Sequence, residues 1–208
     1  MSSNISNSVI RRLPRYYRFL GELKKENVSK ISSGELAERM GLTASQIRQD
    51  LNCFGGFGQQ GYGYNVDLLK NEIGKILGLD NAVPTILIGV GNLGKAVATH
   101  INFESLGFRL IGIFDRKESL IGQMVGNLPI RNISSVDEFC RENMPKAAVF
   151  CIPKEEAKNV SSTLVKCGVK AFWNFSHYDL ALSYPDVIVE NMHFADSLMI
   201  LSYKLTNN

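Results

Sequence analysis

Apolar side chains three or four residues apart predict a helix over residues 9–26. They are Ile10, Leu13, Tyr17, Leu20 and Leu23. Pro14 lies inside this pattern and is expected to start or kink a turn there, because proline cannot donate a backbone hydrogen bond.

Two shorter helices follow, separated by a glycine. Ser32 and Glu35 have the spacing of a capping box, which predicts the start of a second helix that ends at Gly41. Thr43 and Gln46 repeat this spacing and predict a third helix. Two short helices joined by a tight glycine turn predict a helix-turn-helix.

The third predicted helix has one apolar and one polar face. Ile47, Leu51 and Phe54 share a stripe that is expected to pack inward. The residues then left on the outer face are Ser45, Gln46, Arg48, Gln49 and Asn52. Arginine pairs with guanine in the major groove, and glutamine or asparagine pairs with adenine. Exposed helices often carry such residues for solubility alone, so the prediction of DNA binding depends on the helix-turn-helix around them.

Residues 55–65, GGFGQQGYGYN, alternate glycines with aromatic side chains. This pattern predicts a tight hairpin, the wing of a winged helix that reaches a neighbouring minor groove. A flexible linker is the alternative, but linkers are usually poor in large aromatic residues. Residues 67–79 predict a helix that closes this part of the chain, and residues 80–84 predict a hinge.

A short apolar strand over residues 85–89 leads into a G-x-G-x-x-G turn and a helix, the order that a dinucleotide-binding fold requires. The turn consists of Gly89, Val90, Gly91, Asn92, Leu93 and Gly94. A second strand, over 110–114, ends at Asp115, whose carboxylate can accept the ribose hydroxyls of NAD(H) and would repel a 2′-phosphate. NAD(H) is therefore favoured over NADP(H), although Arg116 and Lys117 beside Asp115 weaken this preference. A phosphate-binding loop of an NTPase is the rival interpretation, but Ala96 lacks the hydroxyl that would bind Mg²⁺.

The remaining chain alternates helices and strands as a doubly wound parallel sheet does. Helices are predicted over 134–143 and 154–168, and strands over 147–153, 170–175 and 187–189. A final helix over 193–205 carries an apolar stripe of Phe194, Leu198, Leu201 and Leu205. From spacing alone this stripe fits another subunit or the chain's own domain equally well.

Composition narrows the class of protein. Apolar residues make up 45% and charged residues 21%, which indicates a soluble globular protein, and we expect it in the cytoplasm. The net charge is only +3, but residues 1–80 carry 11 basic against 8 acidic residues, so the positive surplus lies in the predicted DNA-binding part. The four cysteines are scattered, which predicts reduced thiols and no metal site.

No catalytic residues are predicted. His100, His177 and His193 lie in no catalytic motif, and no stretch of chain is left for a substrate domain. We therefore expect a sensor of NAD(H) rather than an enzyme. The alternatives are an NAD-dependent oxidoreductase with a helical N-terminal appendage and a CoA-binding Rossmann module.

The whole sequence resembles the Rex family of redox-sensing transcriptional repressors. The segments that carry the resemblance are RLPRYYRFL, TASQIRQDLNCFGGFGQQGYGYNV, GVGNLGKA, WNFS and VENMHFADSLMILSY. The resemblance implies a winged-helix DNA-binding domain (1–80), a Rossmann domain for NADH and NAD⁺ (81–190) and a C-terminal helix exchanged between subunits of a homodimer (191–208). It further implies that the dimer holds palindromic operator DNA and releases it when NADH binds.

The resemblance also assigns residues. Besides the glycine turn and Asp115, it implies a third cofactor contact, Phe194. The predicted DNA contacts are Arg11, Arg15, Ser45, Gln46, Arg48, Gln49, Gln60 and Tyr62. Glutamine stands at 49, 59 and 60 where relatives have Lys or Arg, which predicts a weaker salt dependence of DNA binding.

Two histidines also depart from the family pattern. His193 stands where relatives often have an Asp that pairs with an arginine, kept here as Arg18, and His100 stands where a Tyr is common. Protonation of these histidines beside Arg18 would make the switch pH-sensitive.

Overall fold

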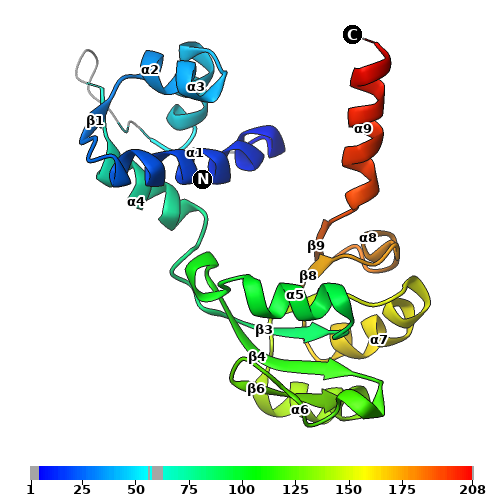
Figure 1. Cartoon of the computed structure of the whole chain (residues 1–208). Coiled ribbons are helices and arrows are strands. Elements are labelled where there is room, and N and C mark those ends of the chain that lie inside the picture. Colours follow the sequence, from blue (N-terminus) through cyan, green and yellow to red (C-terminus); the bar gives the residue numbers. More distant parts are fainter. Residues whose placement is uncertain (1–4, 56, 58–62, 208) are drawn as a thin grey trace. The chain divides into compact units, whose positions relative to one another are not determined.

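The computed structural model describes residues 5–55, 57 and 63–207, which form two compact units, Met1–Asp80 and Asn81–Asn208 (Figure 1). The first unit contains α1 (Asn7–Lys25), β1 (Lys30–Ile31), α2 (Ser33–Met40), α3 (Ala44–Asn52), β2 (Tyr64–Asn65) and α4 (Val66–Ile76). Their buried apolar side chains form one core, so the helix-turn-helix is part of a closed small domain.

Helix α1 differs from its prediction in two respects. Tyr16 is fully buried in place of Tyr17, and Ile10 is 44% exposed. Pro14 lies inside α1, and the helix continues across it, so no new helix starts there, whereas the kink stays a prediction. Leu13 and Tyr16 are both buried on either side of the proline. This packing outweighs the single backbone hydrogen bond that proline cannot donate.

Helices α2 and α3 begin at the predicted caps. The Ser32 hydroxyl accepts the Glu35 N–H at 3.1 Å, and the Glu35 carboxylate accepts the Ser32 N–H at 2.8 Å, which completes the capping box. Helix α2 then ends at Gly41, whose φ is 63°. The Thr43 hydroxyl caps α3 in the same way, but the Gln46 side chain does not return the bond, so this second box is only half formed.

The predicted wing is only partly described. β1 and β2 pair antiparallel, with Lys30 opposite Asn65 and Ile31 opposite Tyr64. The end of the glycine-rich segment therefore joins a two-stranded sheet. Residues 56 and 58–62, which include Gln60 and Tyr62, lie outside the described residues.

The second unit is built on a seven-stranded sheet with the order β5-β6-β4-β3-β7-β8-β9, parallel except for the β5–β6 pair. The strands are β3 (Val83–Ile88), β4 (Phe108–Asp115), β5 (Met124–Val125), β6 (Leu128–Asn132), β7 (Ala147–Phe150), β8 (Ala171–Asn174) and β9 (Ile188–Asn191). The longer helices are α5 (Asn92–His100), α6 (Val136–Asn143), α7 (Lys154–Lys166) and α9 (Phe194–Thr206). The short ones are α8 (Leu180–Ser183), η1 (Glu104–Leu106), η2 (Glu118–Leu120) and η3 (Ile133–Ser135). The β5–β6 hairpin was not predicted, because β5 has only two residues and shows no alternation.

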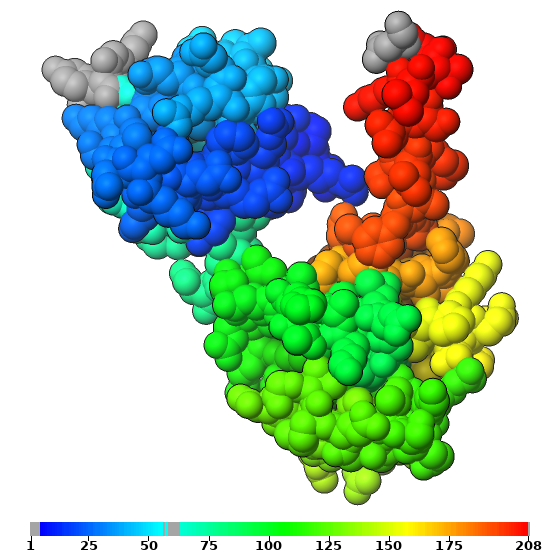
Figure 2. Space-filling view, viewed as in Figure 1, coloured from blue at the N-terminus to red at the C-terminus, as the bar shows by residue number. Residues whose placement is uncertain are grey.

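The two faces of this sheet are covered differently. Side chains from α6, α7 and α8 pack on one face with Phe114, Phe150 and Phe172. Val97 of α5 packs on the other face with Leu87 and Val149. In the space-filling view α9 (red) leaves the body of its unit, and none of its residues is buried (Figure 2).

Candidate dinucleotide cleft and nucleic-acid interface

A cleft of about 720 Å³ lies at the carboxyl ends of β3, β4 and β7. The chain runs from β3 outward to β4 and β6, and then returns to β7 on the other side of β3. Such a reversal separates the loops that follow neighbouring strands and opens a crevice between them, where ligands of doubly wound folds bind. The topology therefore places a ligand site directly above β3.

The glycine turn is shaped by close backbone contacts beneath it. A Cβ on Gly89 would meet the carbonyl oxygen of Cys151, and one on Gly94 would collide with the carbonyl oxygen of Gly89. Gly94 thus allows α5 to approach the end of β3, and Gly89 allows the chain after β7 to lie against the glycine turn. A Cβ on Gly91 would meet nothing within 4 Å. Since Gly91 lines the cleft, a side chain there would fill space that a ligand's diphosphate needs.

The floor of the cleft suits an anion. Gly91 is the N-terminal cap of α5, so the first N–H groups of this helix and its positive dipole end lie at the cleft. Lys95, one turn along α5, also lines it. The residues present thus fit the diphosphate of a dinucleotide.

Asp115 is fixed at the other edge of the cleft. One carboxylate oxygen accepts the Val90 N–H at 2.6 Å, and the other accepts the Lys117 N–H at 2.8 Å. These bonds tie the end of β4 to the glycine turn. They leave the remaining lone pairs of the carboxylate available to ribose hydroxyls.

Sequence reasoning missed the wall contributed by the chain after β7. Pro153, Glu156 and Val160 line the cleft, and Glu156 forms an ion pair with Arg116 at 3.1 Å. One signal could have revealed them: the carboxyl ends of neighbouring parallel strands adjoin, so residues just after the strand at 147–150 had to face the glycine turn.

The predicted cofactor residues separate into two groups. Gly89, Val90, Gly91, Asn92 and Asp115 line the cleft. Leu93 of α5 is partly buried against the core, and Gly94 is buried below Gly89. Phe194 is 60% exposed at the start of α9, and its ring lies 5.9 Å from that of Phe175.

In the first unit, Asp50 organises the helix-turn-helix, and sequence reasoning missed it. It is fully buried in α3, and its carboxylate accepts four hydrogen bonds. They come from Arg12 Nε at 2.6 Å, Arg12 Nη2 at 2.8 Å, the Tyr16 hydroxyl at 2.7 Å and Gln46 Nε2 at 2.8 Å. Gln46 is therefore half-buried and turned toward its own helix, which differs from the outer-face position expected of it.

These contacts fix the protonation states. Burial alone would raise the pKa of Asp50, but the bonds from Arg12, Tyr16 and Gln46 outweigh it and hold that pKa below its usual range. Burial and the neighbouring carboxylate raise the pKa of Tyr16 well above its usual range. The phenol thus stays a donor and Asp50 stays an anion at neutral pH.

The other predicted DNA contacts have different surroundings. Ser45, Arg48 and Gln49 are exposed on α3, and Arg48 Nη1 donates to the Ser33 hydroxyl at 3.0 Å. On α1, Arg11 is exposed, whereas Arg15 is half-buried and donates to the carbonyl oxygen of Met40. The exposed face of α3 and the exposed end of α1 thus provide cationic and amide groups of the kind that contact DNA.

The predicted switch residues are distributed over both units. Arg18 is exposed on α1, and His100 is exposed at the end of α5. His193 caps α9, with its ring 5.0 Å from that of His177 and its Nδ1 3.7 Å from the Asp196 carboxylate. The structure thus adds His177 and Asp196 as neighbours of His193, and the pairing with Arg18 stays a prediction.

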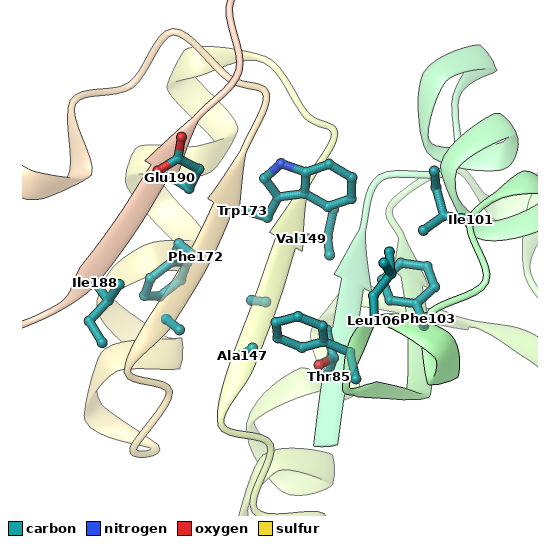
Figure 3. A pocket seen from close by; sticks show the side chains of 13 residues that line it. Thr85, Ile101, Phe103, Leu106, Ala147, Val149, Phe172, Trp173, Ile188 and Glu190 are labelled. Atoms are coloured by element: carbon teal, nitrogen blue, oxygen red, sulfur yellow. The ribbon is translucent and has the colours of Figure 1, made fainter. Parts of the chain in front are cut away.

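Part of the sheet face beside α5 is left uncovered. An apolar pocket of about 330 Å³ opens there, with Phe103, Val149 and Trp173 among the side chains around it (Figure 3). Helix α9 is the matching exposed element. Its large apolar residues point in all directions around the helix: Phe194, Leu198, Met199, Ile200, Leu201, Tyr203 and Leu205, each more than half exposed.

The described ranges 5–55, 57 and 63–207 contain neither a membrane-spanning helix nor a cluster of metal ligands. No helix in them is long and apolar enough to cross a membrane. They also contain no group of three His, Cys, Asp or Glu side chains that could hold a metal ion. All four cysteines carry free thiols.

Comparison with known proteins decides the family. A model described as the N-terminus of a putative DNA-binding protein matches residues 4–52, and a CoA-binding domain model matches residues 80–178. The redox-sensing transcriptional repressor Rex of Caldanaerobacter subterraneus subsp. tengcongensis is 54% identical over 97% of this chain and 89% of the relative. The chain belongs to the Rex family. The Rex protein of Thermoanaerobacter pseudethanolicus is 53% identical over 98% of the chain and 90% of its own length.

Solved Rex structures agree with the fold. The structure of RSP, a Rex-family repressor, in complex with β-NAD⁺ and operator DNA has a TM-score of 0.91 at 51% identity, covering 98% of this chain and 94% of that one. RSP in complex with β-NADH has a TM-score of 0.88 at 48% identity, with coverage of 98% and 95%. The resemblance and the predicted fold class are thereby confirmed. Because the relatives are named repressors, this Rex protein is a regulator and not an oxidoreductase.

Proposed function

We propose that this chain is a redox-sensing transcriptional repressor that binds palindromic operator DNA as a homodimer and leaves it when NADH binds. The supporting observation is the presence of two sites in one chain: a helix-turn-helix with an exposed polar helix and a dinucleotide cleft with a glycine turn. The complexes of RSP with NADH, and with NAD⁺ and operator DNA, support the same assignment. Such a protein acts where the DNA is, in the cytoplasm.

The proposed DNA contacts are made by α3 in the major groove. Ser45, Arg48 and Gln49 reach base edges and phosphates from its exposed face, while Asp50 holds Gln46 and α1 behind it. Arg11 and Arg15 contact the backbone from α1. Gln60 and Tyr62 are proposed to contact the neighbouring minor groove.

The proposed cofactor contacts divide by chemistry. The N–H groups at the start of α5 hold the diphosphate of NAD(H), and Asp115 holds the adenosine ribose. The nicotinamide supplies the redox signal, because its reduced and oxidised forms differ in charge and shape. Phe194 does not line the cleft of its own chain, and we propose that it lies near the nicotinamide of a partner subunit.

The proposed homodimer buries α9. A helix that is apolar on all sides is usually enclosed by more than one surface. In this single chain, no residue of α9 is buried. A second copy provides apolar surfaces of the required kind, among them the uncovered sheet face beside Trp173. We therefore propose that residues 191–208 are exchanged between the two subunits, while residues 1–80 bind DNA and residues 81–190 bind NAD(H).

The test measures release from DNA. The purified protein is titrated onto a fluorescent palindromic duplex and onto a scrambled duplex of equal length, and anisotropy is read with NADH or NAD⁺ added separately. We expect specific binding that NADH reverses and NAD⁺ does not. Asp115→Ala is expected to bind the operator normally and to need about tenfold more NADH for release, because a charge-assisted ribose hydrogen bond is lost. Equal operator affinity at saturating NADH and without NADH would refute the proposal.

A further inference from the structure

The adenosine edge of the cleft carries charges of both signs. Asp115 favours a free ribose hydroxyl, but the next two residues, Arg116 and Lys117, also line the cleft. Cations at this position of a Rossmann fold accommodate the 2′-phosphate of NADP(H). Asp115 therefore favours NAD(H) over NADP(H), Arg116 and Lys117 oppose that preference, and a further acidic group at this edge would strengthen it.

Glu156 is placed to do so. It lies in the first turn of α7, next to Ala157, which is fully buried and anchors that turn. Its carboxylate is 3.1 Å from Arg116 Nη2, and its side chain is only 24% exposed, against 71% for Arg116. The fixed partner of this pair is thus the glutamate, and the mobile partner is the arginine.

We propose that Glu156 is a specificity-determining residue that excludes NADP(H). It acts in two ways: it holds the Arg116 guanidinium on the α7 side of the cleft, and it adds a second negative charge to that of Asp115. A 2′-phosphate brought to this edge would meet two carboxylates and an arginine already engaged by one of them. This inference depends on the proposed binding of NAD(H) in the cleft.

The test compares two cofactors on one protein. Affinities for NADH and NADPH are measured by calorimetry for the unmodified chain and for Glu156→Gln, which keeps the size of the side chain and removes its charge. The quantity of interest is the ratio of the two affinities, since a general loss of cleft structure would weaken both cofactors alike. We expect the ratio to move toward NADPH by about tenfold, the effect of one released arginine–phosphate contact.

Two further variants show whether Arg116 carries the effect. Glu155→Gln makes the same change of charge one residue earlier on α7, at an exposed position that is not among the described residues lining the cleft. We expect it to leave the ratio unchanged. In Glu156→Gln/Arg116→Gln the ratio should return most of the way to that of the unmodified chain, because the released cation is gone.

The outcomes separate this inference from the proposed function. If the unmodified chain binds neither cofactor, the proposed NAD(H) site itself is wrong. If NADH binds and Glu156→Gln changes the ratio less than twofold, the role of Glu156 is refuted. If the ratio shifts equally in the double variant, Glu156 acts by direct repulsion, and its action through Arg116 is refuted.

Discussion

Asp50 has four hydrogen-bond donors around it and no contact with solvent. A buried carboxylate is costly unless it is paired, and here Arg12 supplies the opposite charge through two bonds. The pair explains why Arg12, one of several basic residues near the N-terminus, points inward. It also shows that one positive charge of residues 1–80, that of Arg12, is neutralised inside the fold by Asp50.

The charge state of Asp50 makes the first unit sensitive to acid. Its pKa is held below the usual value in the folded protein, so the ion pair stabilises the fold fully above the unfolded-state pKa, about 3.9. This stabilisation is lost as the pH falls through the lower, folded-state pKa. We expect the free energy of unfolding to decrease steeply below about pH 4. Urea titrations between pH 2.5 and 6 would measure it, and Asp50→Asn should flatten the dependence.

At the scale of the element, α3 is held from behind by α1 and capped at its start by Thr43. The cap satisfies one backbone N–H, and the buried pair fixes the rotation of the helix about its axis. Ser45, Arg48 and Gln49 are exposed as a consequence of this rotation. The polar face of α3 is thus presented by contacts on its opposite side.

Removal of the buried pair should weaken the first unit specifically. Asp50→Ala leaves the Arg12 guanidinium without its partner, and we expect a loss of about 3 kcal/mol in the stability of that unit. Asp67→Ala is the matched control, because it breaks an exposed pair with Lys24 and should cost less than about 1 kcal/mol.

The two units can be followed separately in this experiment. The single tryptophan, Trp173, lies in the second unit, so its fluorescence reports unfolding there, whereas helical circular dichroism reports both units. Asp50→Ala should shift the dichroism transition and leave the fluorescence transition in place. Equal shifts of both transitions would contradict the assignment of this pair to the first unit alone.

At the scale of the whole molecule, the chain carries two functions in two separate units. The proposed DNA contacts lie in Met1–Asp80 and the dinucleotide cleft lies in Asn81–Asn208. If NADH binding in the second unit is to change DNA binding by the first, some element must differ in position or contacts between the DNA-bound and the NADH-bound states. We propose that α9 is this element, since it is exposed in the single chain and would be enclosed in a dimer.

The role of α9 can be tested through the oligomeric state. Leu198 and Leu201 are 67% and 52% exposed, and glutamate at both positions would have to be buried in the dimer. Loss of about 1.5 kcal/mol for each leucine corresponds to at least about a hundredfold weaker association. Sedimentation velocity should then show a monomer at micromolar concentration. Leu182→Glu, at a residue 79% exposed on α8, should leave the dimer intact.

A dimer that survives the double substitution would refute the exchange of α9. Failure of folding is distinguished by circular dichroism, which should match that of the unmodified chain. Operator binding provides a second measure, because two half-sites bound by one dimer are held more tightly than by separate monomers.

The sequence alone determined the features that depend on local spacing. The glycine turn, the capping box of α2 and the alternation of strands with helices are written in neighbouring residues, because backbone geometry acts over a few positions. They were sufficient to predict both units, the fold class and five residues of the cleft. The burial of Tyr16 in place of Tyr17 and the β5–β6 hairpin escaped prediction, since packing overrides weak local preferences.

The tertiary structure decided which distant side chains meet. Asp50 pairs with Arg12, 38 positions away, and Arg116 pairs with Glu156 across the cleft, although neither pair shares a local pattern in the sequence. Such contacts depend on how helices and strands pack, which fixes distances between residues remote along the chain. Local spacing thus specified the kind of sites this protein has, and packing specified which charges are free to act in them.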